Sequence, residues 1–198
     1  MAEEHLAKKD RPRYHHGDLR RALLRVARAE ISRHGAQTVS LTSLARLAGV
    51  SQPAPYRHFP DRASLLEAVA AEAFDELADT LTDAITHHEP RAALASIARA
   101  YLAFGDANIE IYRLMFASRL TPEAQTGSDL DAASTKAFEL LRTAVTTIAP
   151  ANADDDAYLL WAQMHGLVML KADGFITRPL DSFTEMLFRF RDASLTSC

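Results

Sequence analysis

The sequence contains very little cysteine, glycine or proline. Its one cysteine, Cys198, allows neither an internal disulfide nor a Cys-x-x-Cys metal motif. Seven glycines and eight prolines in 198 residues are few for a loop-rich β protein. No run of alternating β-branched residues predicts a sheet, whereas alanine and leucine are abundant. We therefore predict an all-α fold.

Long apolar segments are also missing. The longest apolar run, residues 157–170, is interrupted by Gln163 and His165 and is too short to span a bilayer. The first ten residues lack the apolar segment of a signal peptide. We expect no membrane association and a cytoplasmic location, which suits a chain without disulfides.

No group of residues has the spacing of a catalytic site. We find no nucleophile beside a base, no paired carboxylates on one helix face and no glycine-rich phosphate loop. The adjacent His15 and His16, and the run Asp154–Asp156, lack the further ligands that a metal ion needs. The sequence therefore predicts neither an enzyme nor a cofactor.

Charge is distributed unevenly along the chain. Residues 1–62 hold 12 Lys and Arg against 6 Asp and Glu, whereas residues 63–198 hold 10 against 20. A basic segment joined to an acidic one is typical of a DNA-binding domain followed by another domain, although a chance bias of solvated charges is the alternative. We predict a flexible basic arm over 1–16, a DNA-binding head over 17–62 and a body over 63–198. The arm would follow phosphates or enter the minor groove, or else serve as a solubilising tail.

Residues 41–59 have the pattern of a helix-turn-helix. Leu41, Leu44, Ala45 and Ala48 mark one face of a short helix, and Gly49 suits its left-handed end. A second helix is expected over 51–59, where both prolines fall in the first turn and cost little. The alternative is an ordinary surface turn, because a bare helix-turn-helix pattern is often a false positive.

The start of that second helix carries side chains suited to a major groove. Gln52 can bridge N6 and N7 of an adenine, and Pro53, Ala54 and Pro55 can press on thymine methyl groups. The residues that follow are placed for phosphates, which position a protein without reading sequence.

Several short strings in this region closely resemble the DNA-binding domain of the TetR family of transcriptional regulators. They are Val50-Ser51, Tyr56-Arg57-His58-Phe59, Asp61-Arg62 and Leu65-Leu66. The resemblance covers roughly residues 15–75 and departs at Pro55, where the family more often has a bulky apolar residue. It implies that Thr42 lies where family members place a base-contacting side chain. The predicted DNA contacts are Thr42, Arg46, Ser51, Gln52, Pro53, Ala54, Tyr56, Arg57, His58 and Arg62.

Apolar periodicity predicts about nine helices in all. Besides the two above, we expect helices over 18–33, with Asp18 as N-cap, and over 61–87, 91–108, 108–118, 130–149, 154–173 and 179–192. A polar loop is expected over 121–129. The helix over 61–87 would join the head to the body.

The string Trp161-x-x-x-His165-Gly166, with Tyr112–Phe116 upstream, resembles the C-terminal domain carried by one TetR branch, the Trp-His-Gly type. That resemblance implies a helical ligand-binding and dimerisation domain whose last two helices pair with their copies in a four-helix bundle. Aromatic and methionine side chains suit an apolar pocket. The candidates are Tyr101, Phe104, Tyr112, Met115, Phe116, Phe138, Trp161, Met164, His165 and Met169. At helical spacing such residues are also ordinary core, and His165 can be a core histidine.

Taken together, these features predict a homodimeric repressor that binds a palindromic DNA operator and is released from it by a small apolar effector. Alternatives of the same fold are an activator or a ligand-independent DNA-binding protein. Alternatives of other classes are a helical protein–protein adaptor and an enzymatic or ligand-binding bundle with a vestigial head.

Overall fold

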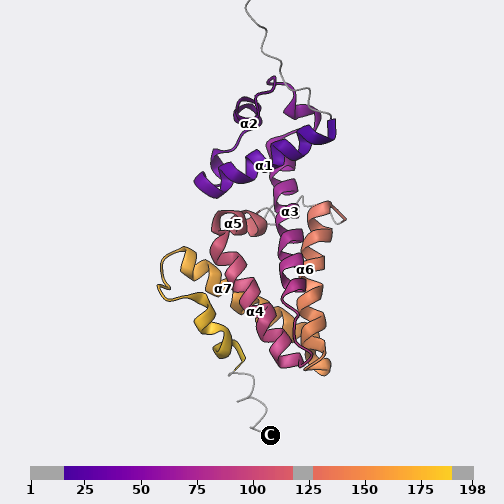
Figure 1. Cartoon of the computed structure of the whole chain (residues 1–198), viewed down its shortest axis with the longest axis vertical. Coiled ribbons are helices and arrows are strands. Elements are labelled where there is room, and N and C mark those ends of the chain that lie inside the picture. The colour runs from indigo at the N-terminus through magenta and orange to yellow at the C-terminus, as the bar shows by residue number, and fades with distance from the viewer. Residues whose placement is uncertain (1–15, 118–126, 189–198) are drawn as a thin grey trace, which may run out of the picture.

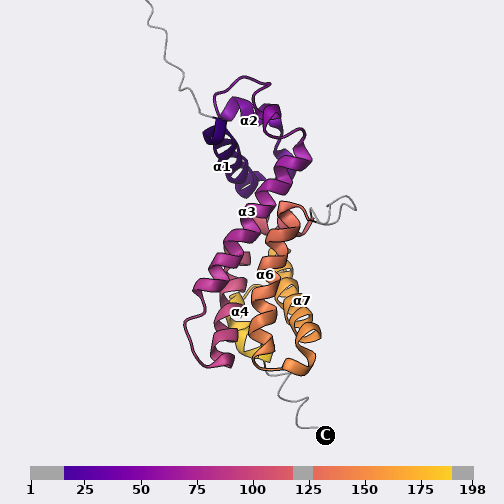
Figure 2. The same cartoon turned by 90° about the vertical axis from the view of Figure 1, so that its right-hand side faces the viewer.

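The computed structural model describes residues 16–117 and 127–188. The molecule is elongated, with a small helical head above a larger helical body, and one helix, α3, runs from the first into the second (Figure 1, Figure 2). No strand occurs in either described range. The all-α prediction is confirmed.

The head begins with α1 (His16–His34), η1 (Ala36–Thr38) and α2 (Leu41–Leu47). Helix α1 starts two residues before the predicted position, so Asp18 lies inside its first turn and is not its N-cap. Ser40 caps α2 through a reciprocal pair of hydrogen bonds with Ser43, which satisfies backbone donors that the helix leaves open. Gly49 follows with a φ of 69°, the left-handed conformation expected for this turn.

The second helix of the motif is shorter and tighter than predicted. Residues 52–54 form a turn, and only Pro55–Arg57 are helical, as the 3-10 helix η2. Pro53 and Pro55 have no backbone N–H to donate, so hydrogen bonds of the 3-10 kind take over, such as His58 N–H to the carbonyl of Pro55 at 2.9 Å. The prediction of a regular helix over 51–59 was therefore wrong.

Helix α3 (Arg62–Asp83) is continuous from the head into the body. Asp61 caps it by accepting from Ser64 N–H at 2.7 Å, and this hydrogen bond lowers the pKa of the Asp61 carboxyl. The helix ends four residues earlier than predicted, because Thr86 N–H donates to the carbonyl of Ala84 and closes a turn. Leu65 and Phe74 are both buried in one apolar core that extends from the head through the body.

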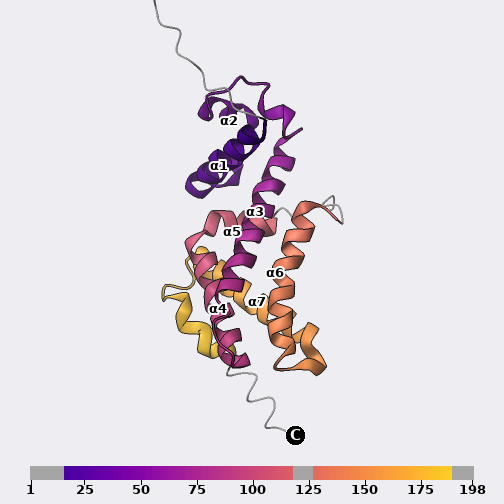
Figure 3. The same cartoon turned by 45° about the vertical axis from the view of Figure 1, so that its right-hand side comes forward.

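The body consists of α4 (Pro90–Ala107), α5 (Ile109–Ala117), α6 (Asp129–Thr146), η4 (Pro150–Asn152), α7 (Ala153–Ala172) and η5 (Leu180–Phe183). A short helical stretch over 184–188 follows. Each of α4 to α7 lies within three residues of its predicted bounds. Helix α3 packs against α4, α5 and α6, and α7 packs against α4 and α6 (Figure 3). Of the arm predicted over 1–16, His16 is the first residue of α1 and the rest lies outside the described residues. Most of the loop at 121–129 and the end of the ninth helix also lie outside them.

Candidate DNA interface and ligand pocket

The predicted DNA contacts gather at the end of the head that is furthest from the body (Figure 1). On α2, Thr42 and Arg46 are exposed, and Leu47 beside them is 48% exposed despite being apolar. In the segment after the turn, Ala54 and His58 are half-buried, and the other predicted contacts are exposed: Ser51, Gln52, Pro53, Tyr56 and Arg57. Leu47 was not among the predicted contacts, although it falls outside the apolar face formed by Leu41, Leu44, Ala45 and Ala48.

Two residues of the same segment face inwards and hold it on the head. Pro55 is buried, and Phe59 is only 2% exposed. The guanidinium of Arg20 on α1 lies over the Phe59 ring, 5.4 Å from its centre, which adds a cation–π contact. Pro55 therefore fills the inward position where the TetR resemblance expects a bulky apolar residue.

The predicted cations of the interface differ in their surroundings. Among the described residues, no carboxylate forms an ion pair with Arg46 or Arg57, so both guanidinium groups are available to an anion. Arg62 is instead tied to the head, because its Nε donates to the carbonyl of Val39 and its Nη2 to that of Ala36, both at 2.8 Å. Sequence reasoning missed this anchoring, and a phosphate contact by Arg62 stays a prediction.

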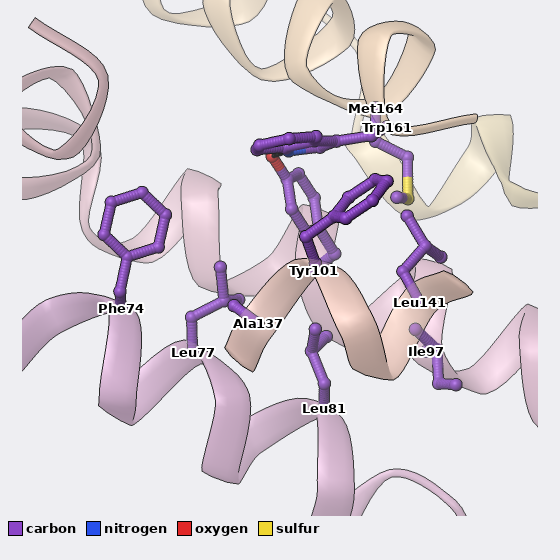
Figure 4. A pocket seen from close by; sticks show the side chains of 10 residues that line it. Phe74, Leu77, Leu81, Ile97, Tyr101, Ala137, Leu141, Trp161 and Met164 are labelled. Atoms are coloured by element: carbon purple, nitrogen blue, oxygen red, sulfur yellow. Dashed lines mark hydrogen bonds between the residues drawn. The ribbon is translucent and has the colours of Figure 1, made fainter. Parts of the chain in front are cut away.

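The body contains a narrow apolar cavity enclosed by helices α3, α4, α6 and α7 (Figure 4). Its free space is about 10 Å³, which is roughly what one water molecule needs. Every lining residue is apolar or aromatic: Phe74, Leu77, Leu81, Ile97, Tyr101, Ala137, Phe138, Leu141, Trp161 and Met164. A larger molecule can enter only if these side chains or the helices that carry them move apart.

The structure brings four of the predicted pocket residues into this lining: Tyr101, Phe138, Trp161 and Met164. It also adds residues from α3, which were expected only as linker core. Tyr112, Phe116 and His165 form a layer beside the cavity, with Phe116 in ring contact with Trp161 at 6.0 Å and with His165 at 4.4 Å. Phe104 and Met115 are buried core residues, and Met169 is half-buried against the core. Ligand contacts by these six residues stay predictions.

A row of hydrogen bonds connects the cavity wall to that layer. Trp161 Nε1 donates to the hydroxyl of Tyr101 at 2.8 Å, the hydroxyls of Tyr101 and Tyr112 are 2.7 Å apart, and the hydroxyl of Tyr112 lies 2.9 Å from His165 Nδ1. Burial raises the pKa of both tyrosine hydroxyls and lowers the pKa of the His165 imidazole. All four groups are therefore neutral at pH 7.

Helix α5 connects α7 to the head. Arg113 on α5 donates to the Asp173 carboxylate at 2.6 Å and to the carbonyl of Ala172 at 3.2 Å, at the end of α7. On its other side α5 packs against α1 and η1. Arg113 lies in the Tyr112–Phe116 string, but nothing in the sequence indicates its bridge to Asp173.

The outer face of α7 is apolar and lacks a partner among the described residues. Leu159 is 53% exposed and Leu170 is 46% exposed, with Ala162 and Gly166 between them on the same face. A Cβ built on Gly166 meets no atom within 4 Å. Nothing in the described part of the subunit itself therefore requires a glycine in the middle of this helix.

Residues 16–117 and 127–188 contain no group of three or more His, Cys, Asp or Glu side chains able to hold a metal ion. None of the helices in these two ranges has the length and apolarity needed to cross a bilayer.

Comparison with protein families gives two matches that together cover both parts of the chain. Residues 23–69 match "Bacterial regulatory proteins, tetR family". Residues 94–190 match "Tetracyclin repressor-like, C-terminal domain". No curated protein matches the sequence.

Many solved structures share the fold. A protein of unknown function from Rhodococcus sp. RHA1 is 33% identical, with a TM-score of 0.80 over 91% of this chain and 98% of that one. A TetR family transcription regulator from Marinobacter aquaeolei VT8 is 21% identical, with a TM-score of 0.65 over 85% and 91%. The regulator FadR from Bacillus subtilis, in complex with stearoyl-CoA, is 11% identical, with a TM-score of 0.65 over 86% and 96%. At these identities the last two show the fold alone.

Proposed function

Because the chain belongs to the TetR family of DNA-binding transcriptional regulators, we propose that it is a homodimeric repressor released from its operator by a small apolar ligand. Family membership makes it a regulator and not an enzyme. Dimerisation, repression, ligand release and a cytoplasmic location are parts of the proposal.

Base reading is assigned to the segment between Gly49 and Phe59. The exposed Gln52 supplies the amide that pairs with an adenine, and Thr42 on α2 reaches the same groove. Arg46 and Arg57 supply charge for phosphates, since no carboxylate of the described residues neutralises either. A single short segment reads few base pairs, so a specific operator requires two heads.

The outer face of α7 supplies the dimer interface. Leu159 and Leu170 are apolar and exposed, and Gly166 lets a partner helix approach closely between them. A glycine inside a helix lowers the stability of the helix by about 1 kcal/mol relative to alanine. Close packing of the partner helix against Gly166 would offset this cost. A two-fold axis beside α7 would present two heads about 34–36 Å apart, one turn of DNA, on a palindrome.

The observation that carries ligand release is the course of α3. The helix starts at Arg62, which is hydrogen-bonded to the head, and three turns later lines the cavity with Phe74, Leu77 and Leu81. The cavity is almost filled, so a bound molecule must displace its walls. A ligand that prefers the displaced arrangement shifts the population towards it, and the two heads then change their spacing. One relative of the same fold, FadR from Bacillus subtilis, has been solved with stearoyl-CoA.

The proposal is tested with fluorescence anisotropy on DNA from upstream of the protein's own gene, over a series of salt concentrations and with competitor DNA. We expect tight binding to one palindromic segment with two subunits per site. Gln52→Ala should cost about 1–3 kcal/mol on that segment and relax one base position. Arg57→Ala, the matched control, should weaken all sequences alike and reduce the salt slope by about one. If binding to every fragment is weak and disappears at moderate salt, the proposed specific operator is contradicted. If Gln52→Ala loses the same affinity on all sequences, the proposed base contact of Gln52 is contradicted.

An activator of the same fold is the second candidate, because the same dimer bound at a different distance from a promoter would recruit polymerase. Measuring transcription from the bound promoter with and without the protein separates the two.

A further inference from the structure

The wall of the apolar cavity is thinnest where α6 meets α7. Eight of the ten lining residues are buried, and none of these eight is more than 6% exposed. The other two, Phe138 on α6 and Trp161 on α7, are half-buried. Each of these two side chains therefore borders the cavity and also reaches solvent. They come from neighbouring helices, since α6 and α7 lie side by side (Figure 2).

Stacked aromatic rings close this part of the wall. The centre of the Phe138 ring lies 4.5 Å from that of the Tyr158 ring and 5.2 Å from that of the Trp161 ring. Tyr158 does not line the cavity and is 58% exposed, so it covers Phe138 from the solvent side. A molecule that passes from solvent to the cavity at this point meets Tyr158 first and then Phe138.

The two rings can move without disturbing the rest of the body. Tyr158 is a surface side chain, and exposed side chains change rotamer within picoseconds to nanoseconds. The Phe138 ring has no polar atom, and contacts with its two neighbouring rings stabilise the closed position. One turn away on both helices, Arg142 and Asp154 form an exposed ion pair at 3.5 Å, which contributes little. Rotation of Phe138 and Tyr158 therefore opens the wall and leaves both helices folded.

The walls formed by α3 and α4 are closed more firmly. Their lining side chains, among them Leu77, Leu81 and Ile97, are at most 3% exposed. A path through them would displace side chains that are packed on all sides, and a close-packed core resists such movement. Entry between α6 and α7 requires the displacement of only two rings.

We propose that apolar ligands enter the cavity between α6 and α7, through an entrance that the Phe138 ring closes and that Tyr158 keeps closed from the solvent side. The inference rests on the proposed function, in which this cavity is the effector site, and it adds the route to that site. Tyr158 is a positioning residue, because it holds Phe138 in place and does not line the cavity. It therefore controls the rates of ligand entry and exit and leaves the affinity unchanged.

The single tryptophan of the chain lies beside this entrance, so its emission reports on ligand entry. The probe is iodobenzene, an apolar molecule whose iodine atom quenches indole emission on contact. Saturable quenching gives the affinity, and stopped-flow mixing gives the rate constants of association and dissociation. In Ala137→Leu, which fills the cavity, saturable quenching should disappear. That control shows that the probe binds in the cavity and not on the surface.

Variants of Tyr158 separate rate from affinity. Tyr158→Ala removes the outer ring and leaves the cavity lining unchanged. Both rate constants should rise about fivefold, the effect of one lost aromatic pair, while the Kd stays the same. Tyr158→Phe keeps the stacked ring and should behave like the wild type.

Variants of α6 test the inner ring. Phe138→Ala removes both ring contacts and should accelerate association at least about tenfold. Leu141→Ala, the matched control, shortens a lining side chain of the same helix that is buried, and it should leave the association rate unchanged.

The proposed entrance is overturned if iodobenzene binds saturably but Tyr158→Ala leaves both rate constants unchanged or alters the Kd. It is also overturned if Leu141→Ala accelerates association as much as Phe138→Ala. An absence of saturable quenching in the wild type would overturn the cavity as a ligand site, and the entrance with it. Operator binding is measured separately on DNA, so these results leave the DNA part of the proposed function to its own test.

Discussion

At the residue scale, Arg62 illustrates how a cation at an unfavourable place on a helix is retained. It stands in the first turn of α3, where the helix dipole disfavours positive charge. Two hydrogen bonds to the carbonyls of Val39 and Ala36 offset this cost, because hydrogen bonds with a charged donor are stronger than neutral ones. The head and the linking helix are thereby joined at one side chain.

Replacing Arg62 separates its structural role from a DNA contact. Arg62→Ala should lower the free energy of unfolding by about 1 kcal/mol, because two carbonyls lose their protein donor but remain near water. If Arg62 also contacts a phosphate, the salt slope of DNA binding should flatten by about one. Chemical denaturation measures the first effect and anisotropy over a salt series the second. An unchanged unfolding free energy would contradict the anchoring role.

His165 makes a pH-dependent contribution to stability. Burial lowers the pKa of its imidazole in the folded protein below the usual 6.5. As the pH falls, His165 therefore takes up a proton in the unfolded chain before it does so in the folded protein. The contribution of neutral His165 to the free energy of unfolding is complete above pH 6.5 and is lost as the pH falls towards the pKa of the folded protein. Protonation would place a proton on both ring nitrogens, so the hydrogen bond between Nδ1 and the Tyr112 hydroxyl could then run only from the imidazole.

The expected result is a melting temperature that falls more steeply between pH 6.5 and 5 for the wild type than for His165→Gln, whose amide does not titrate and can still form a hydrogen bond with Tyr112. Differential scanning fluorimetry across that range measures both slopes. Identical slopes would show that the pKa of His165 is the same in the folded and unfolded states.

At the element scale, two glycines of the body have opposite surroundings. Gly105 on α4 faces Val168 on α7, and a Cβ placed on it would lie 2.7 Å from a valine methyl carbon. This contact sets the close spacing of α4 and α7, from which Tyr101 reaches Trp161. Gly166 on α7 has open space where its Cβ would be.

Alanine at each position should therefore have opposite effects on the isolated subunit. Gly105→Ala should destabilise the fold by about 1–3 kcal/mol, the usual cost of overpacking a core. Gly166→Ala, the matched control, should leave the subunit unchanged or stabilise it by up to about 1 kcal/mol, since alanine favours a helix. Chemical denaturation at low protein concentration measures both. Equal losses for the two variants would contradict the assignment.

The elements also show how far the sequence alone leads. The left-handed Gly49 and the apolar periodicity are local signals, and they predicted the positions of most helices well. Pro53 and Pro55 were predicted in the first turn of a regular helix. Pro55 does begin a helix, but it is the 3-10 helix η2, and Pro53 lies before it in a turn. The start of α1 was predicted two residues too late, and the end of α3 was predicted four residues too late.

The site depends on contacts between distant residues, which periodicity does not reveal. Tyr101, Phe138, Trp161 and Met164 were predicted from residue type, and the structure places them in one cavity lining. The α3 side of the cavity was missed because Phe74, Leu77 and Leu81 have the spacing of any buried helix face. The Arg113–Asp173 bridge joins residues 60 apart in sequence, and only the packing of α5 against α7 brings them together.

At the scale of the whole molecule, dimerisation through α7 can be tested without disturbing the subunit. Leu159 is 53% exposed, so Leu159→Arg should leave the fold intact while placing two like charges in the proposed interface. We expect the variant to sediment as a monomer and to lose operator binding. Ile85→Arg is the matched control, since Ile85 is 45% exposed but belongs to the segment between α3 and α4 and not to α7. If the Leu159→Arg variant remains dimeric, the outer face of α7 is not the dimer interface.

In the proposed mechanism, α3 transmits the state of the cavity to the DNA-binding head. Ala137 is 6% exposed and lines the cavity from α6, opposite α3. Ala137→Leu would fill the space of about 10 Å³ and push α3 away, as a bound ligand would. Ala132→Leu makes the same change at an exposed position of the same helix.

The most direct measurement is the anisotropy of labelled operator DNA titrated with the wild type and with these two variants, each first shown to be folded and dimeric. The account predicts that Ala137→Leu binds the operator at least about tenfold more weakly, a coupling free energy of about 1.4 kcal/mol, while Ala132→Leu binds like the wild type. Wild-type affinity in a folded Ala137→Leu dimer would contradict the coupling between cavity and DNA.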